Sequence, residues 1–334
     1  MPCPIIDTNT AIKLLCSHEI VAIPTETVYG LFGLATSSLA IQKVYLAKNR
    51  PADNPLICHF WSIEQMLEYV QIPSDFVLPL LEYFGPAPLT LVLPLLENTT
   101  GTSLRCVSAG LSTVCCRIPD HPIALEILKQ VNIPLFGPSA NTSTRVSGVF
   151  AKMIQEDLGD NIAGIVDGGF CPIGLESTII DVTMPNIIKI LRPGVIGSVE
   201  LKKSLVQNNF VDVKIIENAT SKSVTPGAKY RHYSPKTKII LLDELGGNQI
   251  GNFDKVAIII GLSEFLDFTL INLDLGSKYD LTKVCTNLFY NLHLLDKNNF
   301  DQAFFDKSSY DFIYRSDSSV AKAILNRLNK VLGL

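Results

Sequence analysis

Four basic residues stand beside turns or at the ends of apolar strands. Lys48 and Arg50 flank Asn49 just before a proline, and Arg117 and Arg192 close the apolar runs VCC and IL. An arginine at the end of a buried strand can bind a carboxylate or phosphate through two parallel hydrogen bonds. At each position alone, a surface charge or a strand-end salt bridge is the alternative. Their joint placement favours an anion-binding cleft.

Three polar loops add groups that suit a small polar or phosphorylated ligand. Residues 137–148, GPSANTSTRVSG, place hydroxyl and amide side chains between an apolar strand and an expected helix, which suits phosphate or ribose oxygens. The loop PTETVYG supplies Thr25 and Thr27, and GLESTIIDV supplies Ser177. Ordinary turns capped by hydroxyl groups are the alternative for the first two loops, and a plain strand start, where β-branched residues are common, is the alternative for GLESTIIDV.

The histidine and carboxylate residues indicate a functional site less clearly than the basic residues and the polar loops do. His59 lies in the apolar run LICHF, where it is either a core residue or a ligand. Glu26 and Glu176 are isolated carboxylates, without a Ser/His/Asp triad or a carboxylate pair beside them. The sequence contains no GxxxxGK[ST], GxGxxG or HExxH motif. A bound nucleotide would therefore depend on side-chain cations and loop amides.

Charge and cysteine usage narrow the class of protein. Residues 1–200 carry 11 Lys and Arg against 18 Asp and Glu, a balance of −7, whereas residues 201–334 carry 17 against 14, a balance of +3. Neither part has the strongly basic composition of a general nucleic-acid binder, so we expect no stable nucleic-acid binding. The eight cysteines lack CxxC spacing, which predicts reduced core thiols rather than zinc ligands.

Apolar patterning predicts a cytoplasmic protein without membrane attachment. The longest apolar stretch, about residues 87–96, contains two prolines and is too short to cross a bilayer. The N-terminus MPCPIIDTNT has no charged region ahead of an apolar run, so a signal peptide is not expected.

Length and periodicity predict two α/β units, because 334 residues exceed a usual single core. In the first unit we expect strands at residues 19–23, 56–60, 89–93, 114–118, 134–136, 177–182 and 186–191, the last two as a hairpin. Helices are expected at residues 38–47 and 123–130, and after a capping box of Ser62 and Gln65. In the second unit we expect strands at residues 239–242, 256–260 and 270–273, and helices at 281–295 and 321–331.

Seven of these segments in one order resemble the YrdC-type threonylcarbamoyl-AMP synthases. They are IPTETVYGLFGLA, KNRPADNPLICH, GPAPLTLVL, TVCCRIPDHP, FGPSANTSTRVS, GLESTIIDV and ILRPGVI. The later TPGAKYRHYSP and a second α/β unit resemble the long form of that family. The resemblance implies a twisted mixed sheet around a concave cavity in residues 1–205, a linker or lid at 206–237, and a smaller Rossmann-like α/β domain at 238–334. Asn49 departs from the family's usual glycine, which puts the local loop geometry in question.

The resemblance also implies roles for individual residues. Lys48 and Arg50 would be catalytic. The threonine site would comprise Thr25, His59, Arg117 and Ser177. The ATP site would comprise Lys48, Arg50, Asn54, Thr113, Ser139, Asn141, Ser147, Arg192 and, from the linker, Tyr230. Mg²⁺ would accompany ATP, held mostly by the phosphates.

The implied activity is synthesis of L-threonylcarbamoyladenylate from L-threonine, bicarbonate and ATP, with release of pyrophosphate. The product would pass to a tRNA threonylcarbamoyl transferase that modifies adenosine 37. Three alternatives stay open. They are a non-enzymatic RNA-binding module, a carbamoyltransferase of hydrogenase maturation, against which the lack of paired CxxC motifs counts, and an amino-acid sensor in the second unit.

Overall fold

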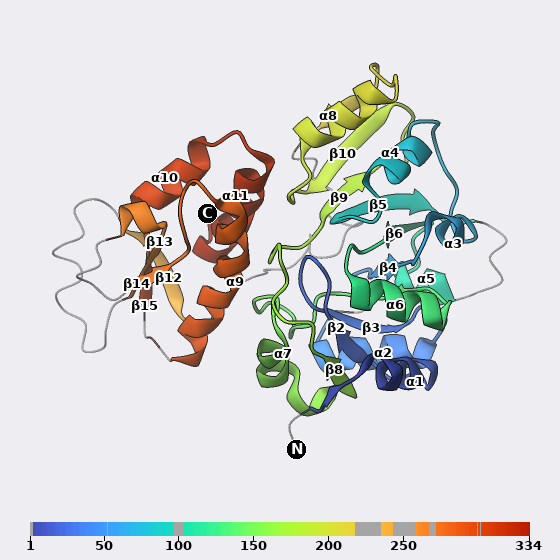
Figure 1. Cartoon of the computed structure of the whole chain (residues 1–334), viewed down its shortest axis with the longest axis horizontal. Helices are drawn as coiled ribbons and strands as arrows, with labels where there is room; N and C mark the ends of the chain where they lie inside the picture. The colour runs from blue at the N-terminus through green and yellow to red at the C-terminus, as the bar shows by residue number, and fades with distance from the viewer. Residues whose placement is uncertain are drawn as a thin grey trace.

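The computed structural model describes residues 3–51, 53–96, 103–217, 235–242, 258–266, 272–298, 300 and 302–334. Within them, two β-sheets organise the chain into an N-terminal unit, up to residue 217, and a C-terminal unit, from residue 235 (Figure 1). The larger sheet has 11 strands and the smaller has 4. The α/β class and the cavity-bearing mixed sheet agree with the sequence prediction, whereas the exact domain boundaries stay a prediction.

The strands of the large sheet are β1 (Ile5–Ile6), β2 (Val21–Ile23), β3 (Gly30–Leu34), β4 (Ile57–His59), β5 (Leu89–Pro94), β6 (Thr113–Arg117), β7 (Leu135–Phe136), β8 (Gly164–Val166), β9 (Thr178–Asp181), β10 (Ile187–Arg192) and β11 (Lys214–Ile216). Their helices are α1 (Thr8–Cys16), α2 (Ser38–Lys48), α3 (Ile63–Leu67), α4 (Val77–Phe84), α5 (Ser103–Val107), α6 (Pro122–Val131), α7 (Ala151–Leu158), a 3₁₀ turn η1 (Gly159–Asn161) and α8 (Ser198–Gln207). Each strand and helix expected in this unit is present, with ends shifted by a residue or two.

The large sheet is mixed, in the order β1-β8-β2-β3-β7-β4-β6-β5-β9-β10-β11. The neighbours β4 and β6 run parallel, and their register sets His59 opposite Arg117. Side chains alternate between the faces of a strand, so Ile57 and His59 share one face with Cys115 and Arg117. This face carries the cavity described below.

Local sequence explains how α2 ends and how α3 begins in the N-terminal unit. The helix α2 ends at Asn49, whose φ of 49° and ψ of 43° are left-handed. Asparagine tolerates this conformation better than most residues, so it substitutes here for glycine without distorting the turn. The expected capping box forms only in part. Ser62 accepts a hydrogen bond from the amide of Gln65, but the Gln65 side chain accepts from the amide of Trp61 rather than that of Ser62.

The small sheet is parallel, in the order β12-β15-β13-β14. Its strands are β12 (Lys238–Leu242), β13 (Ile258–Gly261), β14 (Asn272–Asp274) and β15 (Gln302–Asp306), and its helices are a 3₁₀ turn η4 (Ser263–Phe265), α9 (Leu281–Lys297), α10 (Lys307–Arg315) and α11 (Ser319–Leu332). Two of the expected strands begin outside the described residues, at 256–257 and 270–271. The sequence did not predict β15, because its apolar run AFF is short and lies between polar residues.

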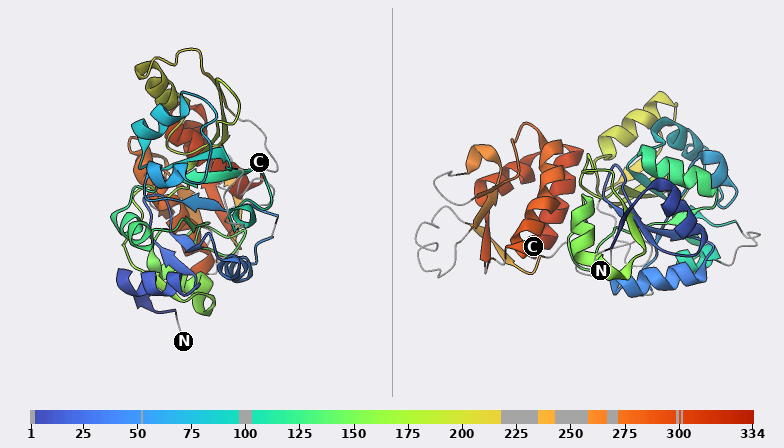
Figure 2. Two further views of the ribbon diagram at one scale, coloured as in Figure 1. Left: turned by 90° about the vertical axis from the view of Figure 1, so that its right-hand side faces the viewer. Right: turned by 60° about the horizontal axis from the view of Figure 1, so that its bottom comes forward.

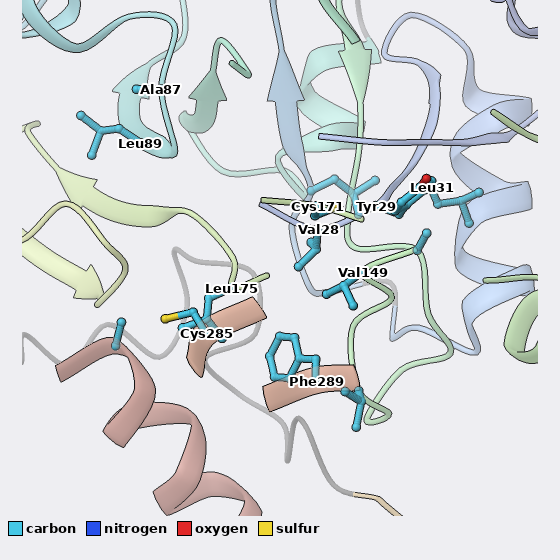
Figure 3. Packing of buried hydrophobic residues seen from close by; sticks show 14 of the residues in the cluster. Val28, Tyr29, Leu31, Ala87, Leu89, Val149, Cys171, Leu175, Cys285 and Phe289 are labelled. Atoms are coloured by element: carbon cyan, nitrogen blue, oxygen red, sulfur yellow. The ribbon is translucent and has the colours of Figure 1, made fainter. Parts of the chain in front are cut away.

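The two units share one apolar core. In Figures 1 and 2, α9 lies beside the N-terminal unit, with the small sheet on its far side. Cys285 and Phe289 of α9 belong to the same buried cluster as Leu175 and Val149 of the N-terminal unit, and Figure 3 shows Cys285 beside Leu175. Burial of apolar surface stabilises such an arrangement. No helix in the described part of the chain is long and apolar enough to span a membrane.

Candidate active site

A cavity opens over one face of the large sheet, and its empty space, counted together with the open solvent at its mouth, is about 640 Å³. Nine residues expected to bind substrate line it: Thr25, Arg50, His59, Arg117, Ser139, Asn141, Ser147, Ser177 and Arg192. They come from strands and loops that are far apart in sequence. The fold therefore brings together the basic strand ends and the polar loops that sequence analysis had singled out separately.

Arg117 forms the most buried charged part of this wall. Its side chain is 5% exposed, and its Nη2 lies 2.7 Å from Oε1 of Glu26, which is 6% exposed. The same nitrogen donates a hydrogen bond of 2.9 Å to Oγ1 of Thr27. The buried ion pair fixes the position of the guanidinium at the cavity wall, and removal of either partner would leave an uncompensated buried charge.

The threonines of PTETVYG continue this hydrogen-bond chain. Thr25 Oγ1 donates to the carbonyl oxygen of Val28 at 2.6 Å. Thr27 Oγ1 must then be the donor in its 2.8 Å contact with Thr25 Oγ1. The donor and the acceptor of each hydrogen bond in the chain from Arg117 through Thr27 and Thr25 to Val28 are thus determined. The hydroxyl hydrogen of Thr25 closes a local turn, as the capping alternative predicted, even though Thr25 also faces the cavity.

His59 is both buried and directed to the cavity. Burial, together with the Arg117 guanidinium, holds the pKa of the imidazole well below its usual range, so the ring is neutral. Its ring lies edge-on to Phe32, with centroids 4.9 Å apart. A Cβ at Gly30 or Gly137 would lie 2.5 or 2.8 Å from the Phe32 ring, so only glycine fits on either side. Within the described residues, Nδ1 of His59 has no hydrogen-bond partner.

Lys48 acts on the polar loop and does not line the cavity. Its ammonium group donates a 2.5 Å hydrogen bond to the carbonyl oxygen of Ser139 and another to that of Asn141. Burial and the nearby Arg50 hold the pKa of Lys48 well below its usual range, while Asp157 opposes that effect. Lys48 therefore links the end of α2 to the loop 137–148.

Arg50 reaches the cavity from the turn after α2. Its Nε and Nη2 donate hydrogen bonds to the carbonyl oxygens of Asn54 at 3.3 Å and Pro55 at 2.8 Å. Asn54 itself is buried and does not line the cavity. These two carbonyl groups orient the guanidinium, while Asn49 sets the turn that presents it.

A β-bulge brings Arg192 to the same face. The register of β10 against β9 shifts between Ile190 and Arg192, so that Arg192 pairs with Ile179 rather than continuing the previous alternation. One extra residue moves a side chain to the other face of a sheet. Arg192 then donates from Nε to the Ser177 carbonyl at 2.9 Å and from Nη2 to Ser177 Oγ at 3.1 Å.

Glu176 is a cavity residue that the sequence offered only as an isolated candidate. Its Oε1 accepts a 2.6 Å hydrogen bond from Ser147 Oγ, and its Oε2 pairs with Arg327 of α11 at 3.1 Å. Burial raises the pKa of Glu176. Arg327, Arg192 and the Ser147 hydroxyl together lower it by more than burial raises it, so the net pKa lies below its usual range. The carboxylate is ionised at neutral pH.

Other expected and unexpected residues complete the comparison. Thr113 does not line the cavity, because it lies four residues, or roughly 13 Å, before Arg117 along β6. Tyr230 lies outside the described residues. Sequence analysis missed Arg145, although it stands inside the polar loop, and Arg327, whose position in a regular amphipathic helix gave no signal. No group of three or more His, Cys, Asp and Glu in the described residues could hold a metal ion.

Comparison with family models covers almost the whole chain. Residues 13–194 match the model described as "Telomere recombination", and residues 188–331 match the model described as "Threonylcarbamoyl-AMP synthase, C-terminal domain". A threonylcarbamoyl-AMP synthase of Bacillus subtilis is 34% identical over 97% of this chain and 92% of its own length. One of Schizosaccharomyces pombe is 33% identical over 96% of this chain and 87% of its own length.

A solved structure shares the fold of both units. It is described as the crystal structure of P. abyssi Sua5 complexed with L-threonine. It aligns with a TM-score of 0.84 and 32% identity, and the alignment covers 98% of this chain and 94% of that chain. The likeness therefore extends over the cavity and over the C-terminal unit.

Proposed function

The chain belongs to the YrdC-type threonylcarbamoyl-AMP synthases, and we propose that its cavity joins L-threonine, bicarbonate and ATP into L-threonylcarbamoyladenylate with release of pyrophosphate. One observation carries this proposal. Among the described residues, four arginines, at positions 50, 117, 145 and 192, line the cavity together with one carboxylate, Glu176. This concentration lies within residues 1–200, whose net charge is −7. Such a concentration of cations suits two anionic substrates, a carboxylate and a triphosphate.

We assign Arg117 to the carboxylate of threonine. It is the most buried of the four arginines, and its guanidinium is held in place by the ion pair with Glu26 and the hydrogen bond to Thr27. Neutral His59 lies on the next strand in register, where its imidazole nitrogen can accept a hydrogen bond from the substrate amine. Thr25 and Ser177 would line the same end of the cavity.

The nucleotide would lie toward the outer arginines and the loop 137–148. Arg50 and Arg192 would neutralise phosphate oxygens, and Ser139, Asn141 and Ser147 would be polar partners elsewhere on the nucleotide. Lys48 supports this site through the loop it holds, and Asn54 through its carbonyl bond to Arg50. Thr113 and Tyr230 as ATP contacts stay predictions from the sequence. Use of ATP implies a divalent cation, and Mg²⁺ would enter with the nucleotide as part of the substrate.

The reaction then needs positioning more than a strong base. The amine of threonine and bicarbonate condense to a carbamate with loss of water. An oxygen of the carbamate attacks the α-phosphorus, the bond to the β-phosphate breaks, and the electron pair leaves with pyrophosphate. Arg50, Arg145 and Arg192 line the cavity, and they would surround the place where negative charge develops. Arg117, by pairing with the substrate carboxylate, keeps that group from acting as the nucleophile.

A lid over the cavity and an enzyme that consumes the product belong to the same proposal. The predicted lid is confined to residues 218–237, because residues 206–217 include the end of α8 and the strand β11 of the large sheet. Tyr230, the proposed ATP contact of the lid, lies outside the described residues. The adenylate would be consumed by a tRNA threonylcarbamoyl transferase, because a mixed anhydride of this kind is an activated acyl donor.

Pyrophosphate release measured with each substrate omitted in turn tests the proposal. We expect release to require both threonine and bicarbonate, and serine to react about tenfold more slowly because one packed methyl group is lost. Equal release with serine, or release without any amino acid, would contradict it. RNA binding without such turnover would favour the binding-module alternative.

A further inference from the structure

The C-terminal unit holds the loop that carries two residues of the cavity wall. This loop, residues 171–177, ends with Glu176 and Ser177. Thr286 of α9 donates a 2.9 Å hydrogen bond to the carbonyl oxygen of Pro172. Gly174 has a φ of +74°, and a Cβ there would lie 2.5 Å from the Cα of Thr286. The backbone of α9 therefore rests directly on this loop, beside the packed pair of Leu175 and Cys285 (Figure 3).

Arg327 of α11 contacts the same loop from a second helix. Its side chain is 0% exposed, and its Nε and Nη2 donate to Oε2 of Glu176 at 3.2 and 3.1 Å. Its Nη1 donates to the carbonyl oxygen of Pro193, the residue that follows Arg192. One guanidinium thus joins the two segments that present Glu176 and Arg192 to the cavity.

We propose that Arg327 is a positioning residue for ATP, through which the C-terminal unit sets the orientation of Glu176 and the hydrogen-bonding polarity of Ser147. The inference rests on the proposed function. An ionised carboxylate only accepts hydrogen bonds, so the Ser147 hydroxyl must donate its hydrogen to Glu176. Ser147 then offers only lone pairs to a ligand. It cannot donate to a phosphate oxygen, and it suits a hydroxyl donor of the ribose.

The charges around Glu176 make this arrangement depend on Arg327. Arg327 and Lys330 from α11 and Arg192 from β10 face the carboxylate, and Ser147 is its hydroxyl donor. Burial acts in the opposite direction and raises the pKa of Glu176. Loss of Arg327 removes the largest opposing charge. Glu176 would then protonate at a higher pH and release Ser147 from its donor role.

Arg327→Met tests the inference, with Lys322→Ala as a matched control. Lys322 lies on the same helix and also crosses between the units, but its 3.1 Å pair with Glu217 is largely exposed to solvent, with Lys322 41% exposed. ATP dissociation constants and steady-state rates would be measured from about pH 6 to 8.5. We expect Arg327→Met to raise the KM and dissociation constant for ATP about tenfold or more, and the KM for threonine less than about threefold. Lys322→Ala should match the wild type.

The pH profile separates positioning from mere support of the fold. In Arg327→Met, the pH at which kcat/KM for ATP falls on the acid side should be higher than in the wild type. In the double variant that also carries Glu176→Gln, this shift should be absent. If the single variant does not fold, the neutral pair Glu176→Gln with Arg327→Met is tested instead, and its ATP binding should be weak and independent of pH over this range. A lower melting temperature with unchanged ATP affinity and an unchanged pH profile would overturn the inference. Failure of the wild type to release pyrophosphate with threonine and bicarbonate would instead overturn the proposed function.

Discussion

Lys48 donates a 2.5 Å hydrogen bond from its ammonium group to the main-chain carbonyl oxygen of Ser139. The turn at Lys48–Arg50 and the loop at Ser139–Asn141 are therefore connected directly, although 91 residues separate Lys48 from Ser139. The lysine is 1% exposed, so in this structure it shapes the loop and leaves the cavity to Arg50.

Lys48→Met should weaken both the fold and ATP binding. The substitution keeps roughly the length of the side chain but leaves the buried carbonyl oxygen of Asn141 without its ammonium donor, which costs roughly 1–3 kcal/mol. The carbonyl oxygen of Ser139 loses one of its two donors and keeps the amide of Asn141. We expect a lower free energy of unfolding in urea, together with a raised KM for ATP. Arg50→Ala is the contrast, because it should raise the KM for ATP with a smaller change in stability. An unaltered unfolding free energy for Lys48→Met would show that the loop does not depend on the lysine.

Arg117→Ala should act on threonine first. Loss of a charge-assisted bidentate contact weakens threonine use by roughly 2–4 kcal/mol, as kcat/KM would report. ATP binding measured by calorimetry should change little. Because Glu26 would be left buried and unpaired, Arg117→Ala combined with Glu26→Gln should recover stability but not threonine use. Survival of threonine affinity with collapse of ATP affinity would reverse the assignment.

Stability should fall as the pH drops below about 6.5, the ordinary pKa of histidine. The pKa of His59 is depressed in the folded protein by burial and by Arg117, so the unfolded chain binds a proton more readily. Folding stability is then fully present above about pH 6.5 and declines by up to about 1.4 kcal/mol per pH unit toward the folded pKa. His121, whose pKa burial also lowers, acts in the same direction.

Urea unfolding of the wild type and of His59→Asn at pH 7.5, 6 and 5 measures this decline. The variant should lose part of the pH dependence between about pH 5 and 6.5. An identical slope in both proteins would mean that His59 binds its proton equally readily in the folded and the unfolded chain, which would contradict a depressed pKa.

Periodicity in the sequence predicted the strands and helices well because apolar residues repeat along each of them. Val284, Cys285, Leu288, Phe289 and Leu292 are all buried on α9, as the helical spacing indicated. The short strand β15 escaped prediction because its pairing on both sides is tertiary. Local pattern cannot reveal a strand whose stability comes mainly from its neighbours.

The cavity residues also differ in how far the sequence pattern alone could reveal them. Arg192 could be suspected from its place at a strand end, but the β-bulge that turns it toward the cavity depends on the register with β9. Arg327 could not be found from sequence pattern, because its partner Glu176 lies 151 residues away. Contacts between distant segments decide which charged residues meet, and no local spacing encodes them.

The most direct measurement follows ¹³C-labelled bicarbonate into the product by mass spectrometry. Wild-type protein with threonine, ATP and the label should give an adenylate that carries the ¹³C, because the carbamate oxygen attacks the α-phosphorus. Arg117→Ala should form much less of it. An unlabelled threonyl-adenylate as the main product would mean that the substrate carboxylate itself attacks, and it would contradict both the reaction and the role given to Arg117.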